Sequence, residues 1–146
     1  PLDNDTQITG YPIVMLYVAS SHTDGAFFVY LEDVDPTGYV RYITEGQLRG
    51  IHRKISDTPA PYVTGMPNQS YKRADSAPLP INEVVEITIG LQPTSVMIKR
   101  GHCIRVAIAG ADRDTFAHIP TGETPTWHIS RDTIHPSHIL LPIINK

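Results

Sequence analysis

The chain has 146 residues, of which 40% are hydrophobic and 18% are charged, and its formal net charge at pH 7 is −3. A chain of this length can form one domain around a single core without disulfide or metal staples, and the small negative charge argues against nucleic acid as a partner. No apolar run approaches the roughly 18 to 20 residues that a membrane-spanning helix needs, so no membrane partner is expected.

Apolar residues at every second position predict strands with one covered face in four segments. In chain order these residues are Val14, Leu16 and Val18; Phe27, Val29 and Leu31; Val85, Ile87, Ile89 and Leu91; and Ile104, Val106 and Ile108. Further strands are expected within residues 38–44, 47–53, 127–131 and 139–143. Thirteen prolines leave little room for a long helix, since each interior proline costs about 3 kcal/mol. The pattern predicts an all-β sandwich or barrel.

Turn residues separate these strands at two points. Asp35, Pro36 and Gly38 occupy the first, second and fourth positions of a type I turn, which predicts a hairpin between the flanking strands. Gly101, within residues 99–102, can take the positive φ that a tight reversal often demands, so a second hairpin is expected there.

Two longer segments have the composition of irregular loops. Residues 56–80 contain five prolines among Asn, Gln, Ser and Asp, and residues 112–125 form a second excursion. Loops of this length in a compact domain are usually functional, packed against another body or partly disordered.

The motifs of a self-contained enzyme are missing from the sequence. No serine lies in a G-x-S-x-G elbow, and neither a P-loop nor a G-x-G-x-x-G occurs, so no nucleotide or other cofactor is expected. Serine, histidine and aspartate are all present, but they occur together in any chain of this size, so their presence says almost nothing about a triad.

The lone cysteine and the seven histidines do not indicate a reactive or metal site. Cys103 lies in an alternating strand and is interpreted as a small buried thiol. A single cysteine also excludes an internal disulfide, which weakly favours a cytoplasmic location. His135 and His138 flank an extended segment with a proline, which does not hold both imidazoles on one face as a helix would, so no metal is predicted.

Four charged residues interrupt strand-like stretches, namely Asp33, Arg49, Arg53 and Arg105. Charges buried in a sandwich must be paired and hydrogen-bonded, so a structural role is expected for them. Arg49 and Arg53 are four residues apart on a predicted strand and share a face. They are expected to bind carboxylates such as Asp33 or Asp35, or carbonyls of a neighbouring domain.

A second interpretation of the same surface is a sugar-binding site. Tyr39, Tyr42 or Trp127 would supply the aromatic face on which a sugar ring stacks, and the charged residues would supply its hydrogen bonds. The structural interpretation is favoured over the ligand-binding one.

An ordered set of segments resembles the C-terminal domain of X-prolyl dipeptidyl peptidases and cocaine-esterase-type hydrolases. The Gly-His-x-Ile-Arg element from Gly101 to Arg105 is its clearest member. The remaining segments, in the family's order, are QITG at 7–10, FVYLEDVDPTG at 28–38, EGQLR at 45–49, LQPTS at 91–95 and PSHILLP at 136–142.

The resemblance implies a jelly-roll β-sandwich of the galactose-binding-like type that spans residues 1–146 as a single domain. In that family the domain follows an α/β-hydrolase domain that carries the Ser-Asp-His triad, so residues 1–7 are expected to be a linker. The start at Pro1 without an initiator methionine agrees with a piece of a longer protein. No catalytic residue of the family can be placed on this chain. Some relatives have an Arg-Asn-rich segment where this chain has residues 112–120, which leaves the subfamily open.

The expected function is that of an accessory, non-catalytic domain of a serine hydrolase that acts on ester, amide or X-Pro peptide bonds. The domain would stabilise and pack on the upstream catalytic domain, with residues 56–80 as the candidate docking segment, and would allow homo-oligomer contacts. The alternative is a carbohydrate-binding module. The candidates for structural or interdomain roles are Asp33, Asp35, Arg49, Arg53, His102 and Arg105.

Overall fold

The computed structural model describes residues 1–61 and 65–144, and almost all of its regular structure is β-strand. The described residues form β1 (Thr6–Gly10), β2 (Ile13–Ser20), β3 (Ala26–Val34), β4 (Val40–Arg49), β5 (Val84–Gly90), β6 (Thr94–Ile98), β7 (Cys103–Ala109), β8 (Trp127–Ser130) and β9 (His138–Leu140). Two single 3₁₀ turns, η1 (Gly50–His52) and η2 (Arg73–Asp75), complete the regular elements. In this part of the chain no helix is long and apolar enough to cross a membrane. The predicted all-β class is confirmed.

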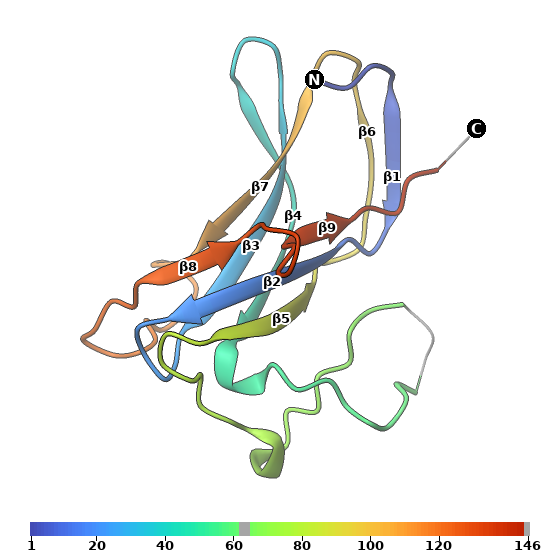
Figure 1. The fold of residues 1–146 in the computed structure, drawn as a ribbon. Coiled ribbons are helices and arrows are strands. Elements are labelled where there is room, and N and C mark those ends of the chain that lie inside the picture. Colours follow the sequence, from blue (N-terminus) through green and yellow to red (C-terminus); the bar gives the residue numbers. More distant parts are fainter. Residues whose placement is uncertain (62–64, 145–146) are drawn as a thin grey trace.

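The strands form two main layers and a smaller ribbon (Figure 1). One layer has the order β4-β3-β7. In the other, β5 pairs with one edge of β2, and β8 and β9 pair with successive parts of its other edge. The third sheet consists of β1 and β6, and Ile143 forms a bridge to Ile8 of β1. The predicted sandwich is confirmed, and residues 6 and 7 of the predicted linker belong to β1.

The core lies between the two main layers and uses the alternation seen in the sequence. Its fully buried members come from β2, β3 and β5, together with Leu48, Leu79 and Leu91. The Trp127 indole stacks on the Phe27 ring with 4.1 Å between centroids. Gly25 and Gly110 lie against this indole, since a Cβ at either position would come within 3.2 Å of it. Trp127 therefore belongs to the core, and it does not present a face for a sugar as the second interpretation requires.

The two predicted hairpins have different outcomes. At the first, the Gly38 N–H donates to the Asp35 carbonyl at 3.0 Å, and β3 pairs with β4 as predicted. At the second, the turn forms with Gly101 at φ 84°. The hairpin predicted there is wrong, because β6 pairs with β1 while β7 pairs with β3. This turn carries the chain from one sheet to another.

Two local predictions, one about a strand and one about a cysteine, are also wrong. The strand expected over residues 47–53 ends at Arg49, because the chain enters η1 where Gly50 packs tightly under Leu79. A Cβ at Gly50 would lie 2.9 Å from a Leu79 methyl group. Cys103, predicted as a buried thiol, is exposed, because it is the first residue of β7 and points away from the core.

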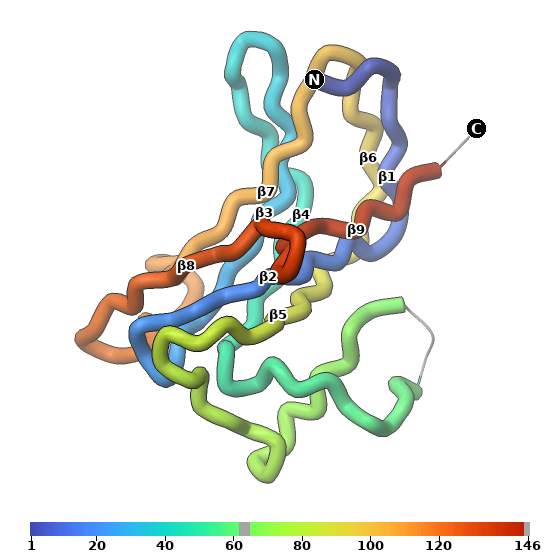
Figure 2. The backbone as a smooth tube through the Cα atoms, viewed as in Figure 1, coloured from blue at the N-terminus to red at the C-terminus, as the bar shows by residue number. Residues whose placement is uncertain are grey.

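Residues 56–80 lie at the opposite end of the molecule from the β3–β4 hairpin tip (Figure 2). Residues 62–64 of this segment lie outside the described residues. The segment folds back on itself, with the Ser56 N–H donating to the Asn68 carbonyl at 2.7 Å. It also contacts the sandwich, since the Gln69 side chain donates to the Thr88 carbonyl at 2.8 Å and Leu79 is buried in the core.

Residues 112–125 begin over the outer face of β3. The Tyr30 hydroxyl donates to the Asp112 carboxylate at 3.0 Å, and the Phe116 ring contacts the Phe28 ring with 5.0 Å between centroids. Burial and this hydrogen bond raise the pKa of Tyr30 to about 12. The start of the excursion is therefore tied to the sheet that carries Asp33.

Candidate functional site

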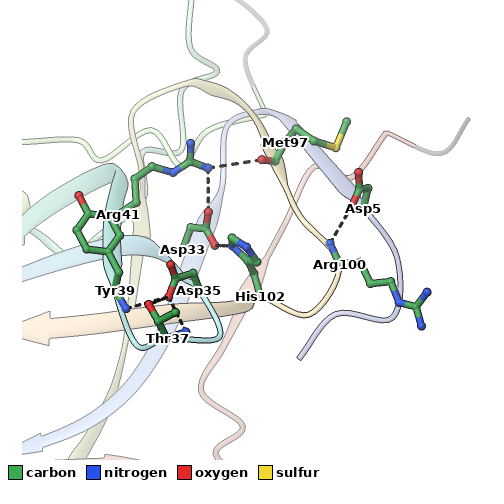
Figure 3. Close-up of polar contacts among 9 residues, drawn as sticks. All are labelled: Asp5, Asp33, Asp35, Thr37, Tyr39, Arg41, Met97, Arg100 and His102. Carbon is green, nitrogen blue, oxygen red and sulfur yellow. Dashed lines mark hydrogen bonds and ion pairs between the residues drawn. The ribbon is translucent and has the colours of Figure 1, made fainter.

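A polar cluster surrounds Asp33 near the end of β3 (Figure 3). We define the Asp33 cluster as Asp33, Arg41 and His102. The Asp33 carboxylate is only 4% exposed, and each of its oxygens has a partner. Oδ2 accepts from Arg41 Nη2 at 2.8 Å, and Oδ1 lies 2.8 Å from His102 Nδ1. The buried carboxylate is thus ion-paired with Arg41 and also contacted by the His102 ring, as a stable buried carboxylate requires.

The register of the β3–β4 hairpin brings Arg41 to Asp33, because these two residues face each other across the strands. A bulge lies just beyond them. Leu31 pairs with Thr44 while Glu32 pairs with Tyr42, so the residue between them on β4 has no opposite partner. Arg41 is not among the residues predicted from the sequence, although its place opposite Asp33 follows from the turn predicted at Asp35.

Asp35 organises the hairpin turn and does not bind an arginine. Its Oδ1 accepts the Thr37 hydroxyl at 2.6 Å, the Thr37 N–H at 2.8 Å and the Tyr39 N–H at 3.0 Å (Figure 3). The Thr37 hydroxyl bond is the largest cause that holds the pKa of Asp35 below its ordinary value of 3.8, and the backbone bonds add to it. The charged carboxylate is therefore the form that stabilises the turn.

This lowered pKa predicts an acid-sensitive turn. The contribution of Asp35 to stability is present above its ordinary pKa of 3.8 and is lost as the pH falls below 3.8 and through the lower folded value. In Asp35→Asn the free energy of unfolding should decrease less over this range than in the unmodified chain. Denaturant unfolding at several pH values tests this. Asp114→Asn serves as the control, because Asp114 makes no hydrogen bond or ion pair within the described residues, and an equal flattening in both variants would contradict the assignment.

The N-terminal residues meet the Asp33 cluster at the turn before β7. Leu2 donates its N–H to the His102 carbonyl at 2.7 Å and accepts from the Gly101 N–H at 2.9 Å. The Asp5 carboxylate accepts the Arg100 N–H at 2.8 Å and contacts Lys99 Nζ at 2.9 Å. The cluster therefore lies beside the first residues of the chain. No pattern in the sequence pointed to Asp5.

Arg49 and Arg53 lie away from the Asp33 cluster, at the other end of β4. Arg49 forms a bidentate pair with Asp24, with Nε 2.9 Å from Oδ2. Arg53 donates to backbone carbonyls of its own domain, including that of Ala77 at 2.6 Å. The prediction that these arginines bind Asp33 or Asp35 is wrong, because the chain leaves the strand between them and they no longer share a face.

Arg105 forms a pair on the outer face of the same sheet as Asp33. Its Nε lies 2.6 Å from the Glu32 carboxylate, and its side chain is half exposed. The expectation of a buried charge at this position is therefore wrong. The residue faces Glu32 directly across β3 and β7, so its position follows from strand pairing.

Two acid–histidine contacts shorter than 3 Å invite comparison with a catalytic triad. Asp33 binds His102, but among the described residues no hydroxyl or thiol forms a hydrogen bond with this histidine. The second contact joins Glu123 to His22 at 2.7 Å, and Ser21 Oγ lies 2.8 Å from the other nitrogen of His22.

The contacts of this second group join the loop after β2 to the loop before β8. Ser21 Oγ accepts the Thr126 N–H at 2.9 Å, and Glu123 is 61% exposed. A triad carboxylate is instead buried and orients its histidine. Five cavities of about 270–560 Å³ lie among the described residues, and none of them is lined by Ser21 or His22. The same part of the chain holds no cluster of three or more His, Cys, Asp or Glu side chains arranged to bind a metal.

The model of the family described as "X-Pro dipeptidyl-peptidase C-terminal non-catalytic domain" matches residues 1–140. Among curated proteins, the chain is 49% identical over 144 residues to a Mycobacterium bovis protein named "Putative serine esterase". The match covers 99% of this chain and 23% of that protein. The chain is 28% identical over 157 residues to a cocaine esterase of Rhodococcus, and this match covers 99% of the chain and 24% of the relative. The chain thus spans about a quarter of the length of these relatives.

Solved structures share the fold at lower sequence identity. A CocE/NonD family hydrolase from Staphylococcus aureus matches with a TM-score of 0.83 at 20% identity, over 99% of this chain and 29% of that one. An α-amino acid ester hydrolase matches with a TM-score of 0.73 at 23% identity, over 99% of this chain and 24% of that one. In both matches the likeness covers nearly all of this sandwich.

Proposed function

Because this chain belongs to the family of X-Pro dipeptidyl-peptidase C-terminal non-catalytic domains, we propose that it stabilises and packs on the catalytic domain of a serine hydrolase. That hydrolase cleaves ester, amide or X-Pro peptide bonds. The observation that carries the proposal is the coverage of the relatives, since 99% of this chain matches only about a quarter of each. The remaining three quarters offer the room for a catalytic domain.

The chemistry of the reaction belongs to the upstream domain in this proposal. A serine nucleophile forms an acyl-enzyme there, and an oxyanion hole stabilises the charge that develops on the carbonyl oxygen. The described residues of this chain contribute structure to that enzyme. The Asp33 cluster and the Asp5 contacts hold the turn before β7 against the N-terminal residues, so they fix the place and direction in which the upstream chain enters.

The carbohydrate-binding alternative gains no support from the aromatic residues proposed for it. The Trp127 ring packs on Phe27 in the core. Tyr39 and Tyr42 are exposed, but they flank the hairpin tip and line none of the five cavities described above. The accessory role is therefore the function that we propose.

Removal of residues 1–146 from the full-length hydrolase tests this role. The truncated enzyme is expected to have a Tm lower by at least about 5 °C, which corresponds to several kcal/mol of lost stabilisation in a catalytic part about three times the size of this chain. It should also lose turnover of p-nitrophenyl esters or X-Pro nitroanilides as its catalytic domain loses support. Thermal unfolding and initial-rate assays measure the two effects.

Ser21→Ala in the full-length enzyme is the matched control, and its turnover should equal that of the unmodified enzyme. An unchanged Tm and unchanged turnover after truncation would contradict the accessory role. Loss of turnover in Ser21→Ala would instead place a nucleophile in this domain.

A further inference from the structure

The core between the two main layers is less completely covered on one side of the sandwich than on the other. On β2, β3 and β5, the residues that point into the core are buried, except for Val85 near the start of β5, which is partly buried. In contrast, no residue of β7, β8 or β9 is fully buried, although several belong to the core face. The partly buried core residues on this side are Ile104, Val106, Ile108, Trp127, Ile129, Ile139 and Leu141.

A groove runs along this side of the molecule, between the edge of one layer and the edge of the other. Figure 1 shows β7 and β8 as the outermost strands of the two layers on this side. We define the open flank as the groove lined by Val106, Ile108, Ile129 and Ile139. It consists of a cavity of about 270 Å³ and an adjoining one of about 440 Å³, which share Ile108 and Ile129 as lining residues.

The β7 strand forms one wall of the open flank and has an unprotected edge. Within the described residues it pairs only with β3. Its seven residues include one charged side chain, Arg105, and no proline. Proteins usually protect such an edge with charges, prolines, bulges or a covering segment, because free strand edges pair with other chains. The apolar composition of β7 therefore predicts that another segment or domain covers its free edge.

The position of the N-terminus indicates what covers the open flank. The backbone bonds of Leu2 to Gly101 and His102 place the N-terminal residues directly beside the start of β7. Any chain that continues upstream of Pro1 therefore leaves the domain next to this edge. Arg131 also lines the groove, and it makes no ion pair within the described residues. It can therefore bind a carboxylate of the surface that covers the groove.

We propose that the open flank is the surface on which the upstream catalytic domain docks, with apolar side chains seated between β7 and β8–β9. This inference rests on the proposed accessory function and adds the surface that serves it. The sequence-based candidate, residues 56–80, is the competing surface. The inner side of that segment is already engaged by its own domain through Gln69 and Leu79.

Cysteine accessibility in the full-length hydrolase tests the docking surface. Val106→Cys lies in the open flank, and Val85→Cys is its matched control, because Val85 is also a partly buried core residue on an edge strand, β5, at the opposite side. Both changes nearly preserve side-chain volume. Iodoacetamide labelling is followed for each peptide by mass spectrometry. Val106→Cys should react at least about tenfold more slowly than Val85→Cys, since labelling then requires the interface to open.

The contradicting results separate this inference from the proposed function. Labelling of Val106→Cys as fast as Val85→Cys, together with protection of Thr58→Cys in residues 56–80, overturns the docking surface and leaves the accessory role intact. Protection of Val106→Cys that disappears when the enzyme is diluted to a monomer assigns the flank to a second copy and also overturns the inference. Fast labelling at all three positions, with an unchanged Tm after truncation, contradicts both proposals.

Discussion

Asp33→Ala is expected to destabilise the folded chain by about 2–4 kcal/mol, because it removes a buried carboxylate that binds both Arg41 and His102. The loss leaves His102, which is 23% exposed, without its carboxylate partner. Arg41 is half exposed and can rehydrate, which keeps the effect below that of a fully buried pair. The variant also removes a contact between β3 and the turn before β7. Equilibrium unfolding in urea, followed by tryptophan fluorescence, measures the change.

Two further variants give this prediction its controls. Asp33→Asn keeps the shape of the side chain, and its amide can still form hydrogen bonds with Arg41 and the His102 ring, so it should cost less than half as much as Asp33→Ala. Arg105→Ala removes a half-exposed pair on the same sheet and should cost about 1 kcal/mol or less. Equal losses in the free energy of unfolding for Asp33→Ala and Arg105→Ala would show that the Asp33 cluster stabilises the fold no more than a surface ion pair does.

Gly46→Ala is expected to cost about 3 kcal/mol or more, because the added methyl group meets backbone atoms that cannot yield by a rotamer change. A Cβ at Gly46 on β4 would lie 2.4 Å from the Gly90 carbonyl oxygen. Hydrogen bonds hold the two segments together at this point. The Gln92 N–H donates to the Glu45 carbonyl at 2.8 Å, and the Thr44 hydroxyl donates to the Gln92 carbonyl at 2.8 Å. The substitution would therefore push the two layers apart.

Gly122→Ala is the matched control for this clash. Gly122 has open space around its Cβ position and a φ of +78°, so alanine there should cost only about 1–2 kcal/mol of backbone strain. Denaturant unfolding of the two variants side by side separates the steric effect from the conformational one. A loss in Gly46→Ala no greater than in Gly122→Ala would mean that the close approach of β4 to Gly90 is readily relieved.

Part of the Asp33 cluster was predictable from the sequence. Asp33 was identified because a charge inside an alternating strand needs a partner, and the turn at Asp35 was identified from its residue order. Arg41 was missed although the turn implies its register, and the bulge beside it leaves no local pattern. Asp5 was missed because its partners Lys99 and Arg100 lie more than ninety residues away. Arg49 and Arg53 were given the wrong partners because the end of β4 depends on the packing of Leu79 against Gly50.

The sequence by itself determined the all-β class, the core-facing residues of four strands and the hairpin at Asp35. These features arise from local rules, since the side-chain period of a strand is two and a type I turn favours particular residues at each position. Only the tertiary structure decided which strands pair, where each arginine binds, why Cys103 is exposed and which side of the sandwich stays open. Strand pairing joins residues that are far apart in the chain, so a turn at residues 99–102 looks the same whether it closes a hairpin or leads from one sheet to another.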